Sequence, residues 1–450
     1  MVKFHLIGVG GAGMSVVAQL LAAQGAQVSG SDQADSPRLQ SLSEHGVTTF
    51  VGHDAAHVPE DAVVVVSTAV KDSNPELAVA RARGQRVIHR SQALALAATG
   101  MEFVAVAGAH GKTTTSGMLA QALSHAGVDA SFAVGGVVKG FGSGAHLGAS
   151  NVFVAEADES DASFLNYSPR IAMVTNVEVD HLDYYGSKDA FEQAFVDFAG
   201  RIEPGGALVV CADDPGANKL GQAYAQAGGR VLTYGFHADS DATLRDPHLG
   251  ECARATLSHN GSQWPLQLRV GGEHNLENAA GAFLVGVELG VEPAVMVRAL
   301  NAFEGTGRRF DFRCEVDGKR LFDDYAHHPS EVEAVLKQAR QVAGDGRVLV
   351  LFQPHLYSRT KNFCDRFAAA LAHADVVVLT DIYGAREAPI EGVSAALISD
   401  QIPGASFVPD LHEAARDLAL QAQPGDLCLT MGAGSVTEAG STIEQVWLNQ

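Results

Sequence analysis

A chain of 450 residues can form two to four domains at roughly 100–200 residues each, and its 46% of hydrophobic residues can fill several cores. The net charge of -21 argues against nucleic-acid binding, which needs clustered Lys and Arg, and no such cluster occurs. The five scattered cysteines lack a C-x-x-C spacing, which argues against a disulfide framework or a zinc site. We expect a cytoplasmic protein with reduced thiols, because the N-terminus does not resemble a signal peptide. We expect no membrane insertion, because no apolar run reaches the ~18 residues that a span needs.

The first hundred residues alternate short apolar runs with helical segments. Strands are predicted at 4–7, 27–31 and 63–66, with a helix at about 14–24. The run Val63–Val66 is β-branched throughout, which is typical of a strand buried on both faces of a parallel sheet. We predict a Rossmann-like α/β domain over residues 1–99.

A glycine loop follows the first predicted strand. Gly8, Gly10 and Gly13 have the spacing of a dinucleotide-binding loop, with Gly11 inside it, and Asp32 ends the second strand. Such a loop requires only a pyrophosphate at a helix N-terminus. Two ligands therefore fit: NAD, which would make the protein a dehydrogenase, and a UDP-sugar.

A second α/β segment, central and similar to P-loop ATPases, is predicted over residues 100–304. Strands are expected at 103–107, 152–155, 171–175, 207–210 and 231–234, and helices at 113–126 and 275–289. Few helix signals occur over 239–272, which favours antiparallel strands there.

A second glycine loop lies between the strand at 103–107 and the helix at 113–126. Its residues Gly108, Gly111, Lys112, Thr113 and Thr114 form a phosphate loop two residues shorter than the usual pattern. Backbone N–H groups would hold ATP phosphates, Lys112 would contact the β- and γ-phosphates, and Thr113 would hold Mg²⁺. A chance Gly-Lys-Thr at a helix start is the alternative, and the flanking strand and helix disfavour it.

Four carboxylates follow the strand at 152–155, namely Glu156, Asp158, Glu159 and Asp161. They would repel one another at a strand end, and a divalent metal would relieve the repulsion. A solvated acidic turn is the other interpretation. His181 follows the next strand and is a candidate second metal ligand.

A glycine-rich polar stretch at 304–309 links to a third predicted domain, 305–450, which is also Rossmann-like. Apolar strands are expected at 347–352, 376–380 and 427–431. Polar residues cluster at 308–310, 323–329 and 352–360, where clefts form at strand ends. Arginines in these clusters suit a carboxylate or phosphate.

These motifs, in this order, resemble the Mur ligases of bacterial peptidoglycan synthesis over essentially the whole chain. The matching segments are 8–15, 67–71, 74–76, 108–115, 156–160, 176–181, 274–278, 323–329 and 352–360. The resemblance implies three domains, for a UDP-sugar, ATP and an amino acid. It is strongest to the member that joins L-alanine to UDP-N-acetylmuramate. A ligase that recycles a preformed tripeptide is the alternative.

The resemblance also implies cofactors and roles. ATP with Mg²⁺ would phosphorylate the lactyl carboxylate, and the amine of L-alanine would attack the acyl phosphate. The implied catalytic residues are Lys112, Glu156, His181, His327 and Arg359. The implied ligands of Mg²⁺ are Thr113, Glu156 and His181. The implied nucleotide contacts in the later segments are Asn278 to adenine and Arg309, Asp324 and Tyr325 to ATP. The protein is expected to be a monomer or homodimer.

Three features of the chain differ from the pattern of the family or of its later members, and the last of them fits the alanine-adding member. Leu356 stands where the family usually has arginine, so Arg359 would carry more of the amino-acid contact. Ser435 follows Gly434 where aspartate is usual. Residues 191–200 contain no lysine, whereas the ligases that add later residues have a carbamoylated lysine there.

Overall fold

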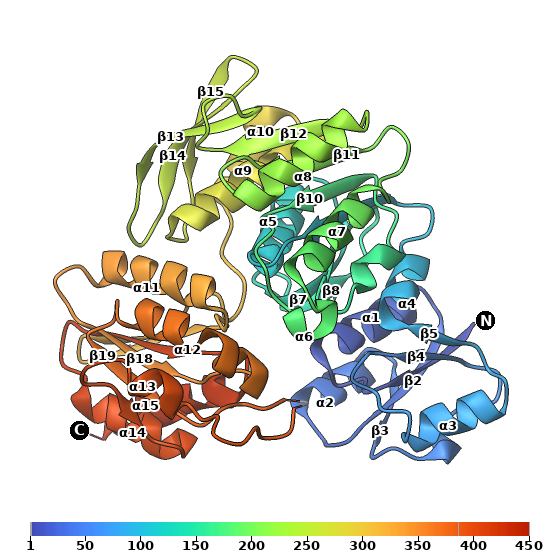
Figure 1. Ribbon diagram of the computed structural model, residues 1–450. Helices are drawn as coiled ribbons and strands as arrows, with labels where there is room; N and C mark the ends of the chain where they lie inside the picture. Colours follow the sequence, from blue (N-terminus) through green and yellow to red (C-terminus); the bar gives the residue numbers. More distant parts are fainter. Residues whose placement is uncertain (1, 386, 450) are drawn as a thin grey trace. The chain divides into compact units, whose positions relative to one another are not determined.

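The computed structural model describes residues 2–385 and 387–449 and contains three α/β sheets (Figure 1). The chain forms two compact units. One contains the residues up to 245, 256–266 and 277–304, and the other contains 246–255, 267–276 and the residues from 305 onward. Within the described residues, no helix combines the length and apolar character needed to cross a membrane.

The first sheet has five parallel strands in the order β3-β2-β1-β4-β5. Its strands are β1 (Lys3–Ile7), β2 (Gln27–Asp32), β3 (Thr48–Val51), β4 (Val63–Val66) and β5 (Val87–His89). Its helices are α1 (Ala12–Ala23), α2 (Pro37–Glu44), α3 (Pro75–Ala82) and α4 (Arg90–Ala97), with the short 3-10 helix η1 (Ala55–His57). Because side chains alternate along a strand, Leu6 packs with α1 on one face, while Ile7 packs with α3 on the other.

The second sheet has ten strands in the order β15-β14-β13-β12-β11-β10-β6-β9-β7-β8. The strands are β6 (Glu102–Ala107), β7 (Ser131–Val138), β8 (Ser143–His146), β9 (Val152–Glu156), β10 (Ile171–Val174), β11 (Ala207–Cys211), β12 (Val231–Gly235), β13 (Ala242–His248), β14 (Arg254–His259) and β15 (Ser262–Gln267). The helices are α5 (Lys112–His125), η2 (Ser163–Asn166), α6 (Leu182–Tyr185), α7 (Lys188–Ala199), α8 (Pro215–Gln226), α9 (Glu273–Glu288) and α10 (Pro293–Asn301).

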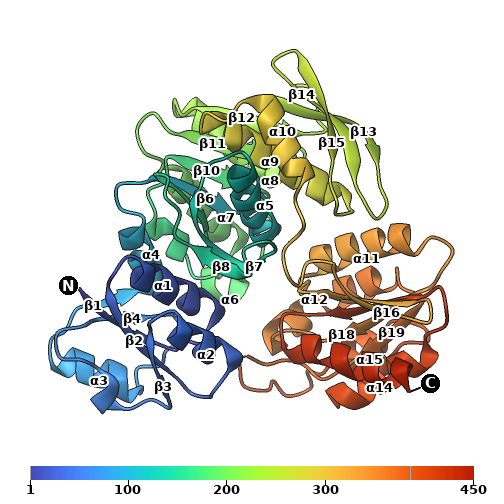
Figure 2. The same cartoon turned by 180° about the vertical axis from the view of Figure 1, so that it is seen from behind.

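Helices cover both faces of the parallel part of this sheet. Residues of α7 and α8 share a buried cluster with one face, and α5 packs on β7 and β9 (Figure 2). The same cluster contains Met14 and Val17 of α1 and Leu94 of α4. The first two sheets therefore share one continuous core.

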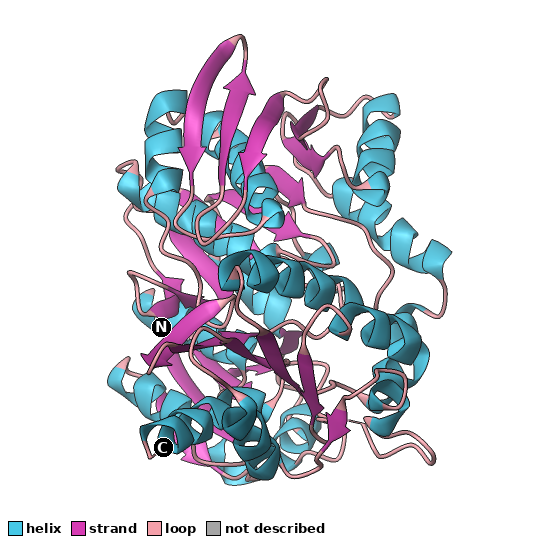
Figure 3. Cartoon of the chain, turned by 90° about the vertical axis from the view of Figure 1, so that its left-hand side faces the viewer, coloured by secondary structure: helices cyan, strands magenta, loops and turns pink. Residues whose placement is uncertain are grey.

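The third sheet has six strands in the order β16-β17-β21-β18-β19-β20. Figure 3 distinguishes the helices and strands of the chain by colour. The strands are β16 (Asp311–Val316), β17 (Lys319–Asp324), β18 (Val348–Phe352), β19 (Val376–Leu379), β20 (Ser406–Phe407) and β21 (Leu427–Met431). The helices are α11 (Pro329–Ala343), α12 (Tyr357–Leu371), α13 (Ala396–Ser399), α14 (Leu411–Gln421), η3 (Ser435–Glu438) and α15 (Ala439–Leu448). One face packs on α11 to α13 and the other on α14 and α15.

The α/β class with mainly parallel sheets is confirmed, and the antiparallel parts are hairpins. β14 and β15 are joined by Asn260-Gly261, with φ values of 49° and 77°. β16 and β17 pair antiparallel across Asp317-Gly318, with φ values of 50° and 74°. Two residues with positive φ give the turn that matches the twist of a hairpin. The hairpin β16–β17 was absent from the sequence prediction. The outer strand β15 contains the exposed residue Pro265.

Candidate active site

Two helices begin at glycines that provide no side-chain cap. The N-cap of α1 is Gly11 and that of α5 is Gly111, whose φ is 82°. By contrast, Asn74 and Asp214 cap α3 and α8 with their side chains. The first N–H groups of α1 and α5 receive no side-chain cap, so both helix ends can accept an anion.

The loop before α5 is held from the end of β10. Thr175 Oγ1 donates to the His110 carbonyl at 2.6 Å, and the Asn176 side chain bonds both the N–H and the carbonyl of His110, at 2.9 and 3.0 Å. Gly108 has a φ of 135° and lies against Thr175, where a Cβ would overlap Oγ1. These bonds hold the loop at the end of β10. Sequence reasoning assigned no role to Thr175, which lies 65 residues from His110 along the chain.

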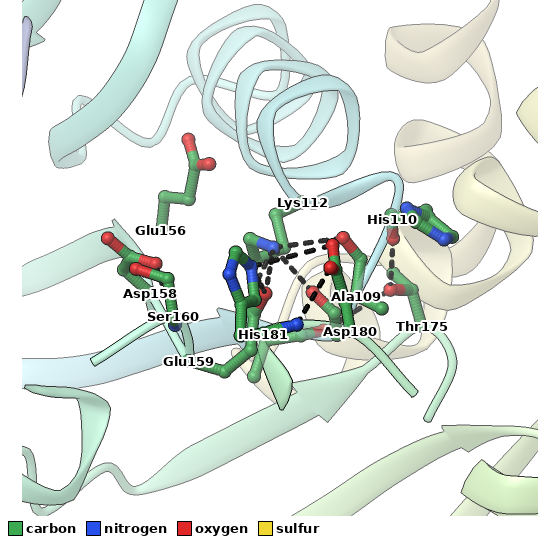
Figure 4. Close-up of polar contacts among 12 residues, drawn as sticks. Ala109, His110, Lys112, Glu156, Asp158, Glu159, Ser160, Thr175, Asp180 and His181 are labelled. Carbon is green, nitrogen blue, oxygen red and sulfur yellow. Dashed lines mark hydrogen bonds and ion pairs between the residues drawn. The ribbon is translucent and has the colours of Figure 1, made fainter. Parts of the chain in front are cut away.

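Lys112 lies across this loop. Its Nζ donates to the carbonyls of Gly108 at 2.6 Å and Ala109 at 3.2 Å, and forms an ion pair with Glu159 at 2.8 Å (Figure 4). Burial lowers the pKa of Lys112, but Glu159 and the neighbouring carboxylates outweigh burial and raise it. The lysine is therefore charged at neutral pH, and the charge stands at the phosphate loop.

Thr113 and Glu156 form the oxygen-rich part of the site. Thr113 Oγ1 donates to both carboxylate oxygens of Glu156, at 2.9 and 3.1 Å, and the Gly135 N–H donates to Glu156 at 2.8 Å. A hydroxyl and a carboxylate are hard oxygen ligands of the kind that Mg²⁺ binds. The donor set at Thr113 and Glu156 thus fits a magnesium ion.

Protein cations balance part of the charge of the acidic segment after β9. Asp158 forms an ion pair with Arg90, and Asp161 accepts from Thr68 at 3.1 Å. Burial raises the pKa of Asp158, but Arg90 and Lys112 outweigh burial and hold that pKa well below its usual range. Protein cations therefore neutralise Asp158 and Glu159, while the expectation of a metal at this segment stays a prediction, for Glu156 in particular.

His181 lies with the counter-ion of Lys112. Its Nε2 is 3.6 Å from a Glu159 oxygen and 3.6 Å from an Asp180 oxygen, and its backbone φ is 52°. In Figure 4 these side chains and Lys112 form one connected group, whereas Glu156 lies apart from it. The structure therefore groups Thr113 with Glu156, and His181 with Glu159.

Asn278 of α9 lies at the same loop. A Cβ on Gly111 would meet Asn278 Oδ1 at 3.1 Å, and the Asn278 side chain is buried. The predicted nucleotide contact thus lies beside the first turn of α5.

The glycine loop of the first sheet is bonded to Asp32. The Gly10 N–H donates to Asp32 Oδ2 at 2.8 Å, and Arg38 donates to the Gly10 carbonyl at 2.7 Å. Gly8 has a φ of 78°, a conformation that favours glycine. Asp32 therefore fixes the loop, and Arg38 brings a positive charge to it.

In the second compact unit, Asp324 ends β17 and holds the segment around Arg309. It accepts from the N–H groups of Phe310 at 2.6 Å and Ala326 at 2.7 Å. Burial raises the pKa of Asp324 to about 6, against the opposing effect of Arg309. The Arg309 guanidinium lies 5.2 Å from the centre of the Tyr325 ring. Arg309, Asp324 and Tyr325, predicted together, are together.

His327 and Arg359 are joined through His355. The rings of His327 and His355 are 5.5 Å apart, and Arg359 lies 3.2 Å from His355 Nδ1. Leu356, the N-cap of α12, is 5% exposed and has a φ of 68°. The apolar side chain at this position is therefore packed inside the fold. Ser435 Oγ accepts from Gln353 at 3.3 Å.

Family models match the chain in three successive segments. Residues 3–101 match the Mur ligase family, catalytic domain; residues 106–286 match the Mur ligase middle domain; and residues 308–434 match the Mur ligase, glutamate ligase domain. The segments correspond to the three sheets.

Relatives and solved structures agree with these matches. A UDP-N-acetylmuramate–L-alanine ligase of Kineococcus radiotolerans is 51% identical over 98% of this chain and 95% of its own length. One of Renibacterium salmoninarum is 49% identical over 98% and 95%. The crystal structure of a UDP-N-acetylmuramate–alanine ligase from Thermotoga maritima has a TM-score of 0.84 at 29% identity and covers 100% of both chains. A murein peptide ligase from Psychrobacter arcticus has a TM-score of 0.76 at 25% identity, covering 100% of this chain and 99% of that one. The chain belongs to the Mur ligase family.

Proposed function

We propose that this protein joins L-alanine to the lactyl carboxylate of UDP-N-acetylmuramate, with ATP converted to ADP and phosphate, in the synthesis of peptidoglycan precursors. The observation that carries the proposal is Lys112, charged and paired with Glu159 on a glycine loop at an uncapped helix N-terminus. The full-length similarity to alanine ligases supports the choice of substrates.

The reaction has two steps. A carboxylate oxygen attacks the γ-phosphorus of ATP and ADP leaves. The nitrogen of L-alanine then attacks the acyl carbon, phosphate leaves, and the nitrogen loses a proton. Two anions must meet in the first step, so the protein has to supply positive charge where they meet.

Lys112 supplies that charge at the phosphate loop. The β- and γ-phosphates would replace its contacts to the Gly108 and Ala109 carbonyls, while Glu159 keeps the ammonium in place. Gly108, Gly111, Thr113 and Thr114 would give backbone N–H groups to the phosphates. Asn278, beside Gly111, is proposed as the contact to the adenine nucleotide.

Mg²⁺ is proposed as the cofactor. Thr113 and Glu156 would hold the ion at the oxygen pair described above. When bound there, it neutralises charge on the phosphates. His181 is proposed as the ligand of a second Mg²⁺, and it lies at Glu159, the carboxylate that also pairs with Lys112.

The second step needs an unprotonated amine. His327 is proposed to assist its deprotonation, and Arg359 is proposed to bind the carboxylate of the amino acid. Arg309, Asp324 and Tyr325 are proposed as further ATP contacts. The glycines Gly8, Gly10, Gly11 and Gly13, with Asp32, are proposed to hold the UDP-sugar.

The proposed domains are residues 1–99 for the UDP-sugar, 100–304 for ATP and 305–450 for the amino acid. We also propose a cytoplasmic protein, since ATP and UDP-sugars are supplied in the cytoplasm, that acts as a monomer or homodimer.

A tripeptide ligase is the competing activity, favoured by the likeness to the Psychrobacter arcticus enzyme. The test is phosphate release with UDP-N-acetylmuramate and ATP, adding L-alanine, glycine, L-serine or the tripeptide separately. We expect the highest kcat/KM with L-alanine. Turnover with the tripeptide alone would overturn the alanine assignment, and no turnover with any amine would overturn the ligase activity.

A further inference from the structure

One arginine lies between the two glycine loops. Arg90 is the first residue of α4, and a methyl group added to Gly13 of the first loop would overlap its Nη1. Its Nη2 is ion-paired with Asp158 in the segment after β9. Burial lowers the pKa of Arg90, but Asp158 and Asp161 outweigh burial and raise it. Arg90 therefore carries a permanent positive charge beside the glycine loop of the first sheet.

Asp158 connects this charge to the second loop. It directly precedes Glu159, the partner of Lys112. Its Oδ1 accepts from the Ser160 N–H at 3.0 Å, and its carbonyl accepts from the Phe164 N–H at 3.1 Å. The segment that carries Glu159 is therefore held by Asp158 at both its side chain and its backbone.

Two further contacts lie along the same seam. Asp161 accepts from Thr68 at 3.1 Å and lies 3.6 Å from His89. Asn166 donates to Ser91 of α4 at 2.8 Å. The residues on either side of Arg90 therefore contact the segment 161–166, and the two sides of this seam belong to the same compact unit.

We propose that the Arg90–Asp158 ion pair couples the two loops, so that a diphosphate ligand on the first loop and a nucleotide on the second bind more tightly together than separately. Asp158 is the positioning residue in this coupling. The inference rests on the proposed function for the identity of the two ligands.

The sign of the coupling follows from the contacts. A diphosphate at the first loop attracts Arg90, which has one guanidinium nitrogen directed at that loop and the other on Asp158. Fixing Arg90 fixes Asp158 and, one residue later, Glu159 and its lysine. The second ligand then binds to a loop before α5 that is already ordered, so it loses less conformational entropy on binding. This gives positive cooperativity. Coupling of this kind is commonly about five-fold or more in affinity, and it is equal in both directions.

The test is calorimetric titration of the full-length protein with UDP-N-acetylmuramate, with and without saturating ADP and Mg²⁺. The wild type is expected to bind the UDP-sugar about five-fold more tightly or better when ADP is present. Asp158→Asn keeps an acceptor for the Ser160 N–H but removes the charge that holds Arg90. We expect this variant to retain the affinity for UDP-sugar alone, because Arg90 is released toward the first loop, and to show a coupling factor near one.

Two further variants separate coupling from general damage to the fold. Arg90→Gln should lose the coupling and weaken the binding of UDP-sugar alone, whereas Asp158→Asn should lose only the coupling. Asp72→Asn removes the exposed ion pair with Arg81 in the same domain, at 2.8 Å, and should keep the wild-type factor.

The coupling alone would be overturned if an active wild-type enzyme bound UDP-N-acetylmuramate equally well with and without ADP and Mg²⁺. An Asp158→Asn variant with the wild-type coupling factor would overturn it as well. A wild-type protein that binds no UDP-N-acetylmuramate would overturn the proposed function and the coupling with it.

Discussion

Lys112 has three acceptors around one ammonium group, two from its own loop and one from Glu159. The loop carbonyls can be exchanged for phosphate oxygens, while Glu159 keeps its bond to the ammonium group. We expect Lys112→Met to lower kcat by at least about 100-fold, since a lost transition-state contact of this kind costs that much. Binding of UDP-N-acetylmuramate alone should persist.

The measurement is steady-state phosphate release together with calorimetry of the UDP-sugar. Lys337→Met on α11, which removes an exposed ion pair with Glu333 at 2.6 Å, is the control and should keep full activity. Retention of turnover in Lys112→Met would contradict the assigned role.

Glu76 is a fully buried carboxylate in the first domain. It accepts from Ser31 at 2.5 Å and from the Asp54 N–H at 3.1 Å, and His5 lies 3.3 Å away. Burial raises its pKa, but the bonds with His5 and Ser31 outweigh burial and bring it to about 2 from 4.5. Because the pKa of Glu76 is lower in the folded protein than in the unfolded chain, this carboxylate stabilises the fold at pH values above about 4.5. That stability is lost as the pH falls from about 4.5 toward 2.

The loss from this one group is up to about 3 kcal/mol. We expect Glu76→Gln to be less stable than wild type at neutral pH and to lose less stability on acidification. Urea unfolding at about pH 6 and about pH 3 measures the difference. Parallel losses in the two proteins would show that Glu76 does not titrate as argued.

At the residue scale, the sequence predicted that Lys112 and Thr113 lie on a glycine loop at a helix start, but it did not predict all the partners of their side chains. Lys112 and Thr113 follow from a local motif whose spacing is fixed by the loop. The pairing of Arg90 with Asp158 spans 68 residues, and no local periodicity encodes it. For that reason the acidic segment was interpreted as a metal site, although protein cations already balance two of its charges.

Helix α5 has a glycine with positive φ at each end, which permits a matched comparison. Gly111 has a φ of 82° and lies against Asn278, whereas Gly127, past the last turn, has a φ of 85° and open space around it. Alanine at either position should cost about 1–2 kcal/mol of stability, because a Cβ is strained in that conformation. Only Gly111→Ala should also weaken the binding of ATP, because its methyl group displaces the Asn278 side chain and narrows the glycine loop before α5.

Thermal unfolding and titration with ADP and Mg²⁺ measure the two effects separately. Equal ADP affinities in the two variants would exclude a specific role for Gly111.

Among the elements, the buried parallel strands were the easiest to predict. Runs such as Val63–Val66 and Leu427–Met431 consist almost wholly of apolar residues, and this composition predicts a strand buried on both faces. The hairpin β16–β17 was missed although Asp311–Val316 alternates charged and apolar residues, which is the period of a half-exposed strand. The Asp317-Gly318 pair between its strands was a second available signal.

The whole molecule contains separate cores in its two compact units. Phe164 is fully buried in the core shared by the first two sheets, where its ring stacks on Phe198 at 4.7 Å. Phe367 is equally buried in the core of the third sheet, 5.4 Å from Phe352. We expect two calorimetric unfolding transitions. Phe164→Ala should lower the midpoint temperature of one transition, and Phe367→Ala should lower that of the other.

Each substitution should cost about 3–5 kcal/mol in its own unit, the usual loss for a buried Phe replaced by Ala. A single transition shifted by both variants would mean that the units unfold together. Domain number was predictable because each predicted domain begins a new run of strands and helices. The shared core was not, since packing of α1 and α4 on the second sheet has no counterpart in sequence spacing.

The position of Pro265 bears on how the protein behaves at high concentration. The ten-stranded sheet ends at β15, and an outer strand offers unpaired N–H and carbonyl groups to any other extended chain. Proline has no N–H, and its exposed ring interrupts the row of donors on that strand. The opposite border, β8, is only four residues long. Both borders therefore disfavour edge-to-edge pairing with the sheet of another copy.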